Sequence, residues 1–113
     1  MKRVALNTAI TLAAVLGAIA FASGARAQAP DGPKLAQQKA CLACHQIDKK
    51  LVGPSYKEVA AKYRADKNAV ANMVKSIRNG SQGKWGPQVP MPPNTTVNDA
   101  EAAILAKWIL TLK

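Results

Sequence analysis

Two cysteines and a histidine stand close together near the middle of the chain, as Cys41, Cys44 and His45. The pattern C-x-x-C-H is the attachment signature of c-type haem. Two thiols at this spacing, at the end of a helix, can add to the two vinyl groups of one porphyrin. The adjacent imidazole then lies under the iron as its proximal ligand. The motif therefore predicts one covalently attached haem c, with His45 as a metal ligand.

Three other uses of this motif fit the sequence less well. A structural zinc site needs about four protein ligands, but His45 is the only histidine and there is no third cysteine. A thioredoxin-like redox pair is expected near a βαβ pattern, and no segment shows sustained strand alternation. A plain disulfide between Cys41 and Cys44 would leave His45 without a role and a small core unfilled.

The sixth iron ligand has to come from another part of the chain, because there is no second histidine. Lysine, methionine, water or an open position remain. Met73 lies on the apolar face of an expected helix, where it is interpreted as a core residue. Met91 lies instead in the proline-rich segment 81–97, whose stiff backbone limits the entropy lost on ligation. We expect Met91 to be the distal ligand; a buried loop anchor is its alternative role.

Ligation by His45 and Met91 has a functional consequence. It raises the reduction potential of the haem and fills both axial positions, so the iron is poorly placed to bind oxygen or peroxide. This favours electron transfer, and we expect the protein not to be an enzyme. The alternative is a haem enzyme or gas sensor in which Met91 is displaced, but the loop offers no polar group suited to distal acid–base chemistry.

The first 27 residues have the three parts of a secretory signal peptide. Lys2 and Arg3 precede an apolar run, and Ala25-Arg26-Ala27 fits the A-x-A cleavage pattern. We expect cleavage after residue 27, which leaves a single domain, 28–113. A retained membrane tether is the alternative, but a spanning helix needs roughly 20 apolar residues and the densest run here is shorter.

Basic residues dominate the charge. The chain holds 16 Lys and Arg against 6 Asp and Glu, and removal of the leader takes three basic residues, so 13 against 6 leaves +7. A basic surface can steer a protein toward an acidic partner, an anionic membrane or nucleic acid. Export and the 4% aromatic content argue against nucleic acid.

Four helices are expected, and the predicted fold class is all-α. The first runs from Pro33 to Ala40 with Asp31 as its cap, and the second follows Ser55. The third starts after Asp66 and stops at Asn79-Gly80. The fourth follows Asn98, whose capping box includes Glu101. The segment 81–97 between the last two helices is too rich in Gly and Pro for regular structure.

Several motifs occur in an order that resembles a known family. They are Cys41 to His45, Leu51-Val52-Gly53-Pro54, Ser76-Ile77-Arg78-Asn79-Gly80, Trp85-Gly86-Pro87, Pro90-Met91-Pro92-Pro93-Asn94 and Ala106-Lys107-Trp108. Over essentially the whole expected mature chain, the sequence resembles the short bacterial class I c-type cytochromes, of the periplasmic cytochrome c-551 type. The resemblance implies that the first and last helices cross and that the haem is wedged among about four helices.

The resemblance also implies roles for residues around the haem. The Pro54 carbonyl would accept a hydrogen bond from the His45 ring, which fixes the tautomer and raises the basicity of the imidazole. Trp85 would donate to a haem propionate, and Asn94 would form a hydrogen bond near the Met91 sulfur. Haem-side or helix-crossing core positions would be filled by Tyr56, Leu105 and Trp108.

Two positions depart from the family pattern. Met91 comes six residues after Trp85, where the pattern has five. Ser76 stands where family members can carry an arginine that faces a propionate, so that propionate is expected to be less neutralised unless Arg78 substitutes.

The predicted function is that of a diffusible carrier of single electrons in a respiratory chain, acting in the periplasm as a monomer. By family likeness, its partners include a terminal oxidase, a nitrite reductase or a peroxidase, with electrons supplied by a quinol-oxidising complex. Some of the lysines close in sequence to haem contacts are expected to ring the haem edge and steer an acidic partner. These lysines are Lys39, Lys49, Lys50 and Lys84.

Overall fold

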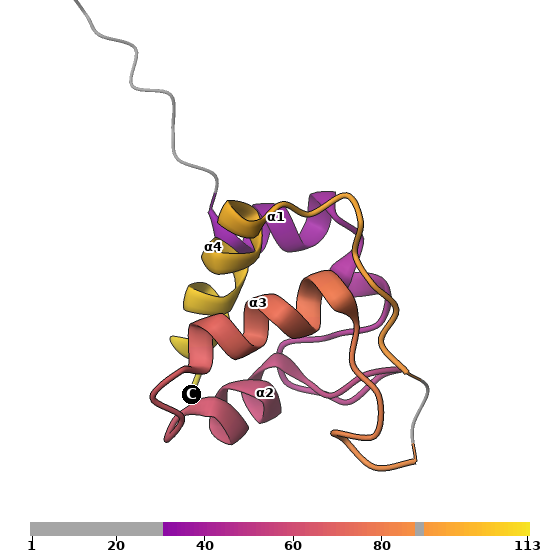
Figure 1. Ribbon diagram of the computed structural model, residues 1–113. Helices are drawn as coiled ribbons and strands as arrows, with labels where there is room; N and C mark the ends of the chain where they lie inside the picture. Colours follow the sequence, from indigo (N-terminus) through magenta and orange to yellow (C-terminus); the bar gives the residue numbers. More distant parts are fainter. Residues whose placement is uncertain (1–30, 88–89) are drawn as a thin grey trace, which may run out of the picture.

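The computed structural model describes residues 31–87 and 90–113, so the expected leader lies outside the described residues. Within them, the elements in chain order are α1 (Gly32–Gln38), the single 3₁₀ turn η1 (Cys41–Ala43), α2 (Tyr56–Tyr63), α3 (Ala69–Asn79) and α4 (Asp99–Leu110). The only β-type pairing in the described residues is an isolated antiparallel bridge between Ser81 and Met91. The all-α prediction with four helices is confirmed (Figure 1). None of the described helices combines the length and apolar character that a membrane crossing requires.

The first helix begins at the predicted cap and ends earlier than predicted. The Asp31 carboxylate accepts a hydrogen bond from the Lys34 N–H at 2.7 Å, and Pro33 lies in the first turn. The helix stops at Gln38 because Ala40 adopts a left-handed conformation, with φ +58° and ψ +22°. This residue reverses the direction of the backbone and starts the turn that contains both cysteines.

Two helices begin with complete capping boxes. At α4, Asn98 Oδ1 accepts from the Glu101 N–H at 2.8 Å, and Glu101 Oε2 accepts from the Asn98 N–H at 3.1 Å. At α2, Ser55 and Glu58 exchange the same pair of bonds, at 3.1 and 2.7 Å. Each box satisfies two backbone N–H groups that the helix start would otherwise leave without an acceptor, which explains why both helices begin at these residues.

The third helix begins at Ala69, two residues later than a start directly after Asp66 would place it. Asp66 accepts from the Asn68 N–H and from the Asn72 side chain, each at 2.8 Å, and so forms a turn ahead of the helix. The end of the helix is as predicted. Gly80 has φ +83°, a conformation that glycine adopts without strain, and it turns the chain away from α3 into the proline-rich segment.

Helix α4 is central to the packing, because it contacts α1, α2 and α3. Its crossing with α1 is close. A Cβ atom added at Gly32 would lie 2.2 Å from Trp108 Cβ, so only glycine allows the two helices to approach in this way. The predicted packing of the first helix on the last is therefore confirmed, and Figure 1 shows both on the same side of the molecule.

Buried side chains form two clusters with a cavity between them. One cluster joins α2, α3 and α4 through residues that include Tyr56, Met73 and Ile109. The other joins α1, α3 and α4 around Leu35 and Leu105. Met73 is only 3% exposed, as expected for a core residue, although it also contributes to the wall of the cavity. The domain is thus built around a central space.

Candidate haem site

The cavity has a volume of about 500 Å³, which lies in the range of about 300–1,000 Å³ typical of ligand sites. Most of its wall is apolar, as ligand pockets usually are. All seven residues predicted from the sequence to contact the cofactor line it: Cys41, Cys44, His45, Pro54, Trp85, Met91 and Asn94. The tertiary structure therefore brings together residues that are up to 53 positions apart in the sequence.

The two cysteines lie on a tight turn beside the cavity. The carbonyl of Cys41 accepts from the N–H groups of Cys44, at 3.2 Å, and His45, at 3.0 Å. Both thiols are free; Cys41 is half-buried and Cys44 is exposed. Burial raises the pKa of the Cys41 thiol. The turn places the two sulfur atoms and the imidazole on one segment that faces the cavity, as covalent attachment of a single macrocycle requires.

The His45 ring is oriented by a backbone carbonyl. Its Nδ1 lies 2.7 Å from the Pro54 oxygen, at a position that the structure buries. A carbonyl can only accept, so Nδ1 carries the proton and Nε2 keeps its lone pair. A histidine held in this way is a pre-formed metal ligand, because the other ring nitrogen fixes the tautomer. This contact is the one that the family resemblance implied.

Two further contacts hold the same ring. The Tyr56 ring stacks on the imidazole with centroids 5.1 Å apart and an interplanar angle of 17°. A Cβ atom added at Gly53 would lie 2.8 Å from His45 Cε1, so the backbone passes directly over the imidazole. Burial raises the pKa of the Tyr56 hydroxyl, which therefore stays neutral. The roles of Tyr56 and Gly53 in orienting the imidazole depend on this close approach and cannot be read from spacing.

Met91 is held by its own backbone. Its N–H donates to the Ser81 carbonyl at 2.8 Å, and its carbonyl accepts from the Ser81 N–H at 3.0 Å. The bridge fastens the proline-rich segment to the end of α3. Gly80 is required beside it, because an added Cβ would lie 2.5 Å from the Met91 oxygen. Met91 is thereby kept on the cavity wall, where it is half-buried.

Asn94 and Trp85 complete the wall on the loop side. The Asn94 backbone N–H and side-chain Nδ2 both donate to the Ile77 carbonyl, at 3.1 and 3.0 Å. Among the described residues Nδ2 donates only to Ile77, and a bond from its second N–H to the Met91 sulfur remains a prediction. Trp85 is half-buried beside the cavity, and the Lys62 ammonium lies 4.4 Å from its ring centroid.

The wall also carries a polar cluster that the sequence did not predict, although Lys84 and Ser76 were each named above. The Lys84 ammonium donates to Tyr63 Oη at 2.7 Å and to Ser76 Oγ at 3.2 Å, and all three residues line the cavity. Tyr63 was not among the residues predicted for the site. No local signal connects these residues, since they come from α2, α3 and the following loop.

The arrangement fits a covalently bound haem. Two thiols for attachment and an imidazole with a free Nε2 lone pair face one apolar cavity, and a thioether lies on the same wall. Zinc is a poor fit, because within residues 31–87 and 90–113 no three His, Cys, Asp or Glu side chains cluster as a metal site would require. Fold and site together define an all-α haem protein.

Comparison with known proteins agrees with this class. The Cytochrome c family model matches residues 29–113. Cytochrome c-551 of Pseudomonas denitrificans is 56% identical over 82 residues, which cover 73% of this chain and 98% of that protein. Cytochrome c-551 of Pseudomonas aeruginosa is 53% identical over 93 residues, 82% of this chain and 86% of that one. The crystal structure of wild-type Nitrosomonas europaea cytochrome c552 superposes with a TM-score of 0.69 at 51% identity, covering 72% and 99% of the two chains.

The chain therefore belongs to the cytochrome c family. Within that family it is a class I c-type cytochrome of the c-551 type, with one haem c attached through Cys41 and Cys44. It is an electron carrier and not an enzyme. The sequence predictions of fold, cofactor and class are thus confirmed.

Proposed function

We propose that the protein is a diffusible, periplasmic carrier of single electrons, whose haem iron is held between His45 and Met91. The observation that supports this proposal most directly is the fixed tautomer of His45. The hydrogen bond to Pro54 leaves Nε2 as a ligand that faces the cavity, and Met91 lies on the wall of the same cavity.

The bound haem supplies the redox-active iron, and the chain supplies its environment. Pro54 keeps the His45 proton on Nδ1, so the imidazole stays oriented in both oxidation states. The bridge to Ser81 and the contacts of Asn94 with α3 hold the methionine segment in place before ligation. Apolar side chains from both core clusters exclude water from the cavity. A thioether ligand and a dry pocket both favour the reduced iron.

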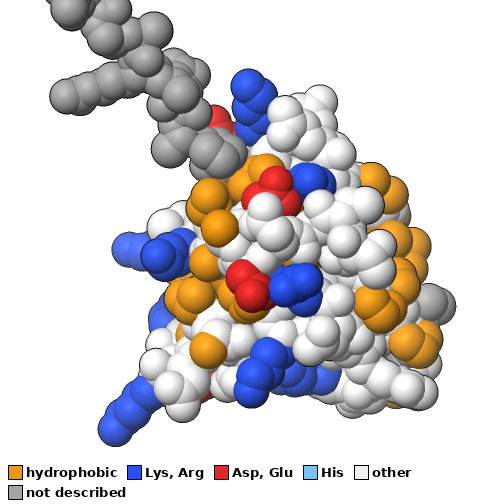
Figure 2. All heavy atoms as spheres, turned by 45° about the horizontal axis from the view of Figure 1, so that its top comes forward, with side chains coloured by type: hydrophobic (Ala, Val, Ile, Leu, Met, Phe, Trp, Pro, Cys, Tyr) orange, Lys and Arg blue, Asp and Glu red, His pale blue; other side chains and the backbone are white. Residues whose placement is uncertain are grey.

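Electron exchange requires a place where a partner can approach. Four large apolar side chains around the cysteine turn are 42–46% exposed: Leu42, Ile47, Leu51 and Val52. Contiguous exposed apolar surface rimmed by polar residues is typical of interaction sites. Lys49 and Lys50 lie between these side chains in the sequence and are exposed. On the face shown in Figure 2, basic side chains are spread widely, and acidic side chains lie beside some of them. An acidic redox partner is the complement of this surface.

The proposed setting is a respiratory chain, in which a quinol-oxidising complex reduces the protein and a terminal oxidase, nitrite reductase or peroxidase oxidises it. Export through the leader 1–27 would deliver a monomeric domain, 28–113, to the periplasm. The intact mass of the protein purified from periplasm tests the cleavage. The proposal requires the mass of residues 28–113 plus one haem, whereas retention of the leader would mean a membrane-tethered carrier.

The ligand pair is tested by replacing Met91. Ferric haem with a methionine ligand has a weak charge-transfer band at about 700 nm, and His/Met ligation gives a high potential. We expect the band in the wild type and its loss in Met91→Ala, together with a fall in reduction potential. Met73→Leu is the matched control and should keep the band, because Met73 is assigned to the core. A wild-type protein without the band would refute Met91 ligation.

A further inference from the structure

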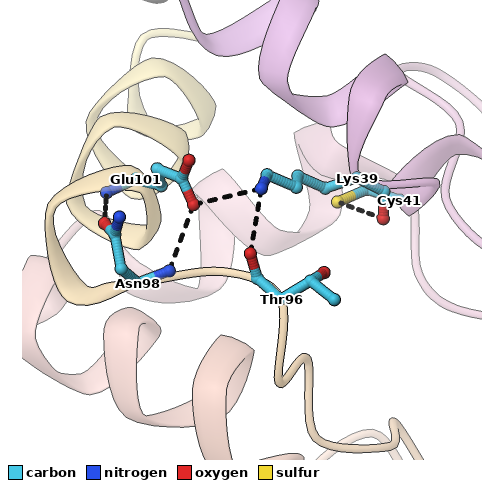
Figure 3. A network of polar contacts seen from close by, with 5 residues as sticks. All are labelled: Lys39, Cys41, Thr96, Asn98 and Glu101. Carbon is cyan, nitrogen blue, oxygen red and sulfur yellow. Dashed lines mark hydrogen bonds and ion pairs between the residues drawn. The ribbon is translucent and has the colours of Figure 1, made fainter.

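The cavity wall carries very little charge. Among its described lining residues, the only ones with a full charge are Lys39 and Lys84, and none is an Asp or Glu. The two lysines differ in their partners. Lys39 Nζ lies 3.4 Å from Glu101 Oε2 and donates to the Thr96 carbonyl at 2.9 Å (Figure 3). Its charge is therefore already matched by a carboxylate.

Lys84 has no such partner. Its ammonium is held by two neutral hydroxyls, those of Tyr63 and Ser76, and no Asp or Glu in the described residues forms an ion pair with it. The position of the lysine is well defined, because the Lys62 ammonium donates to its carbonyl at 2.6 Å. The result is a corner of the cavity with one positive charge and two hydroxyl groups.

The other charged groups considered for this corner are Asp66, Lys62 and Arg78, and none of them lines the cavity. The Asp66 carboxylate attracts the Lys84 ammonium without forming an ion pair with it, and its oxygens accept from Asn68 and Asn72. Arg78 was considered above as a substitute for the arginine that Ser76 replaces. The structure corrects this idea, because Arg78 donates to Asp99. Lys84 is thus the charge on the cavity wall that has no ion-pair partner within residues 31–87 and 90–113.

We propose that Lys84, supported by the Tyr63 and Ser76 hydroxyls, binds one of the two haem carboxylates. The proposal rests on the haem position assumed under the proposed function. It assigns a role to a lysine that would otherwise be counted among the partner-docking residues.

The physical reason is the cost of burying charge. A carboxylate that enters a largely apolar cavity loses hydration, and it stays ionised only if an opposite charge and hydrogen-bond donors replace the water. Lys84 supplies the charge. Tyr63 and Ser76 hold the ammonium on the wall, and each hydroxyl can also rotate to donate to a carboxylate oxygen. Trp85, the next residue along the chain, also lines the cavity, so its predicted N–H contact would be made from the same part of the wall.

The test compares the haem-loaded wild type with Lys84→Gln, Lys84→Arg and the control Lys107→Gln on α4. Reduction potentials are measured at neutral pH and low ionic strength. Loss of a positive charge beside the haem destabilises the reduced state, so Lys84→Gln should lower the potential. Lys84→Arg should restore most of the shift, and Lys107→Gln, which removes the same charge from an exposed site outside the cavity, should shift it much less. Equal shifts in Lys84→Gln and Lys107→Gln would overturn the proposal.

A second measurement needs no variant. In a crystal structure of the haem-loaded wild type, Lys84 Nζ should lie within about 4 Å of a haem carboxylate oxygen. An ammonium that contacts only Tyr63 and Ser76 would overturn the proposal even if the variants misfold. The band at about 700 nm separates this result from the proposed ligation. Retention of the band in Lys84→Gln shows that the Met91 ligand is intact, whereas its absence in the wild type refutes the ligand pair alone.

Discussion

The imidazole of His45 is held from three directions by residues within eleven positions of it in sequence. The Pro54 carbonyl fixes one ring nitrogen, Tyr56 stacks on one face, and the Gly53 backbone passes over the ring edge. Tyr56 in turn meets Trp108 edge to face, with centroids 5.3 Å apart. The orientation of one ligand thus depends on contacts that reach from the cysteine turn to α4.

The contact at Gly53 yields a prediction. In Gly53→Ala the added methyl group would lie 2.8 Å from His45 Cε1, so the ring must move and its bond to Pro54 weakens. We expect a loss of about 1–3 kcal/mol in the free energy of unfolding, typical of overpacking, and altered haem spectra. Chemical denaturation and absorption spectroscopy measure both.

The control is Gly83→Ala, where no atom lies within 4 Å of the added Cβ but φ is +72°. It should lose stability through backbone strain and leave the spectrum of the haem unchanged. A Gly53→Ala protein with wild-type spectrum and stability would show that the ring tolerates displacement.

Strain at Ala40 gives a second prediction. The left-handed conformation destabilises the folded state by about 1–2 kcal/mol when the residue has a Cβ. A glycine at this position avoids that cost, but it lowers the unfolding free energy by about 0.4–1 kcal/mol because the unfolded chain gains conformational entropy. Ala40→Gly should therefore raise the unfolding free energy by up to about 1 kcal/mol. Ala61→Gly, at an exposed position within α2, should lower it by about 1 kcal/mol. Urea titration of both haem-loaded variants tests this, and a destabilised Ala40→Gly would contradict the strain argument.

Polar contacts at the start of α4 connect this helix to α1 and to the segment that precedes it. Glu101 closes the capping box of that helix and also faces Lys39, from the end of α1. Lys39 in turn donates to Thr96 in the segment that leads into α4 (Figure 3). One carboxylate therefore connects a helix start, a helix end and the loop that carries Met91.

This network predicts how stability depends on pH. The Asn98 N–H, and then Lys39, hold the pKa of Glu101 below its ordinary value of 4.5. A lowered folded-state pKa means that the contribution of Glu101 to stability is complete above the ordinary value. It is lost as pH falls through the folded-state pKa.

The variant Glu101→Gln retains a side-chain acceptor but lacks the charge. Its melting temperature should fall less than that of the wild type between neutral and acid pH, so the two curves should converge in acid. Parallel curves over the whole acid range would show that Glu101 contributes no pH-dependent stability.

The whole molecule combines a strongly basic composition with exposed apolar side chains around the cysteine turn. These side chains are Leu42, Ile47, Leu51 and Val52. In the proposed function, long-range attraction would bring an acidic partner close, and the exposed apolar side chains around the cysteine turn would then pack against it. Attraction of this kind weakens as salt screens it over a Debye length of about 10 Å at 0.1 M ionic strength. Rapid turnover benefits from this combination because association is fast and the complex is short-lived.

The docking surface is tested by charge removal. In the double variant Lys49→Gln/Lys50→Gln, the rate of electron exchange with an acidic redox protein should fall at low salt, and its salt dependence should become shallower. Lys107→Gln/Lys113→Gln removes the same charge from the end of α4 and should have a smaller effect. Stopped-flow kinetics at several ionic strengths measure this, and identical salt dependence in the two double variants would place the docking surface elsewhere.

Structural features that depend on residues close together in the chain could be predicted from the sequence. The C-x-x-C-H turn specified covalent haem, and the caps at Asp31, Ser55 and Asn98 specified where three helices begin, because each depends on bonds spanning about three residues. Helix ends were less certain. The first helix stops at Gln38 because Ala40 is left-handed, and no residue type there announces that conformation.

The sequence by itself therefore determined the cofactor and the all-α class, and it supplied the prediction that His45 and Met91 are the iron ligands. Only the tertiary structure decided what surrounds them: that Lys39 is matched by Glu101, that Arg78 turns to Asp99, and that Lys84 joins Tyr63 and Ser76 at the cavity. The physical reason is the range of the interactions. Caps and attachment motifs depend on residues that are neighbours in the chain. The ion-pair partner of a charged side chain depends on which groups the packing of distant elements brings within a few ångströms of it.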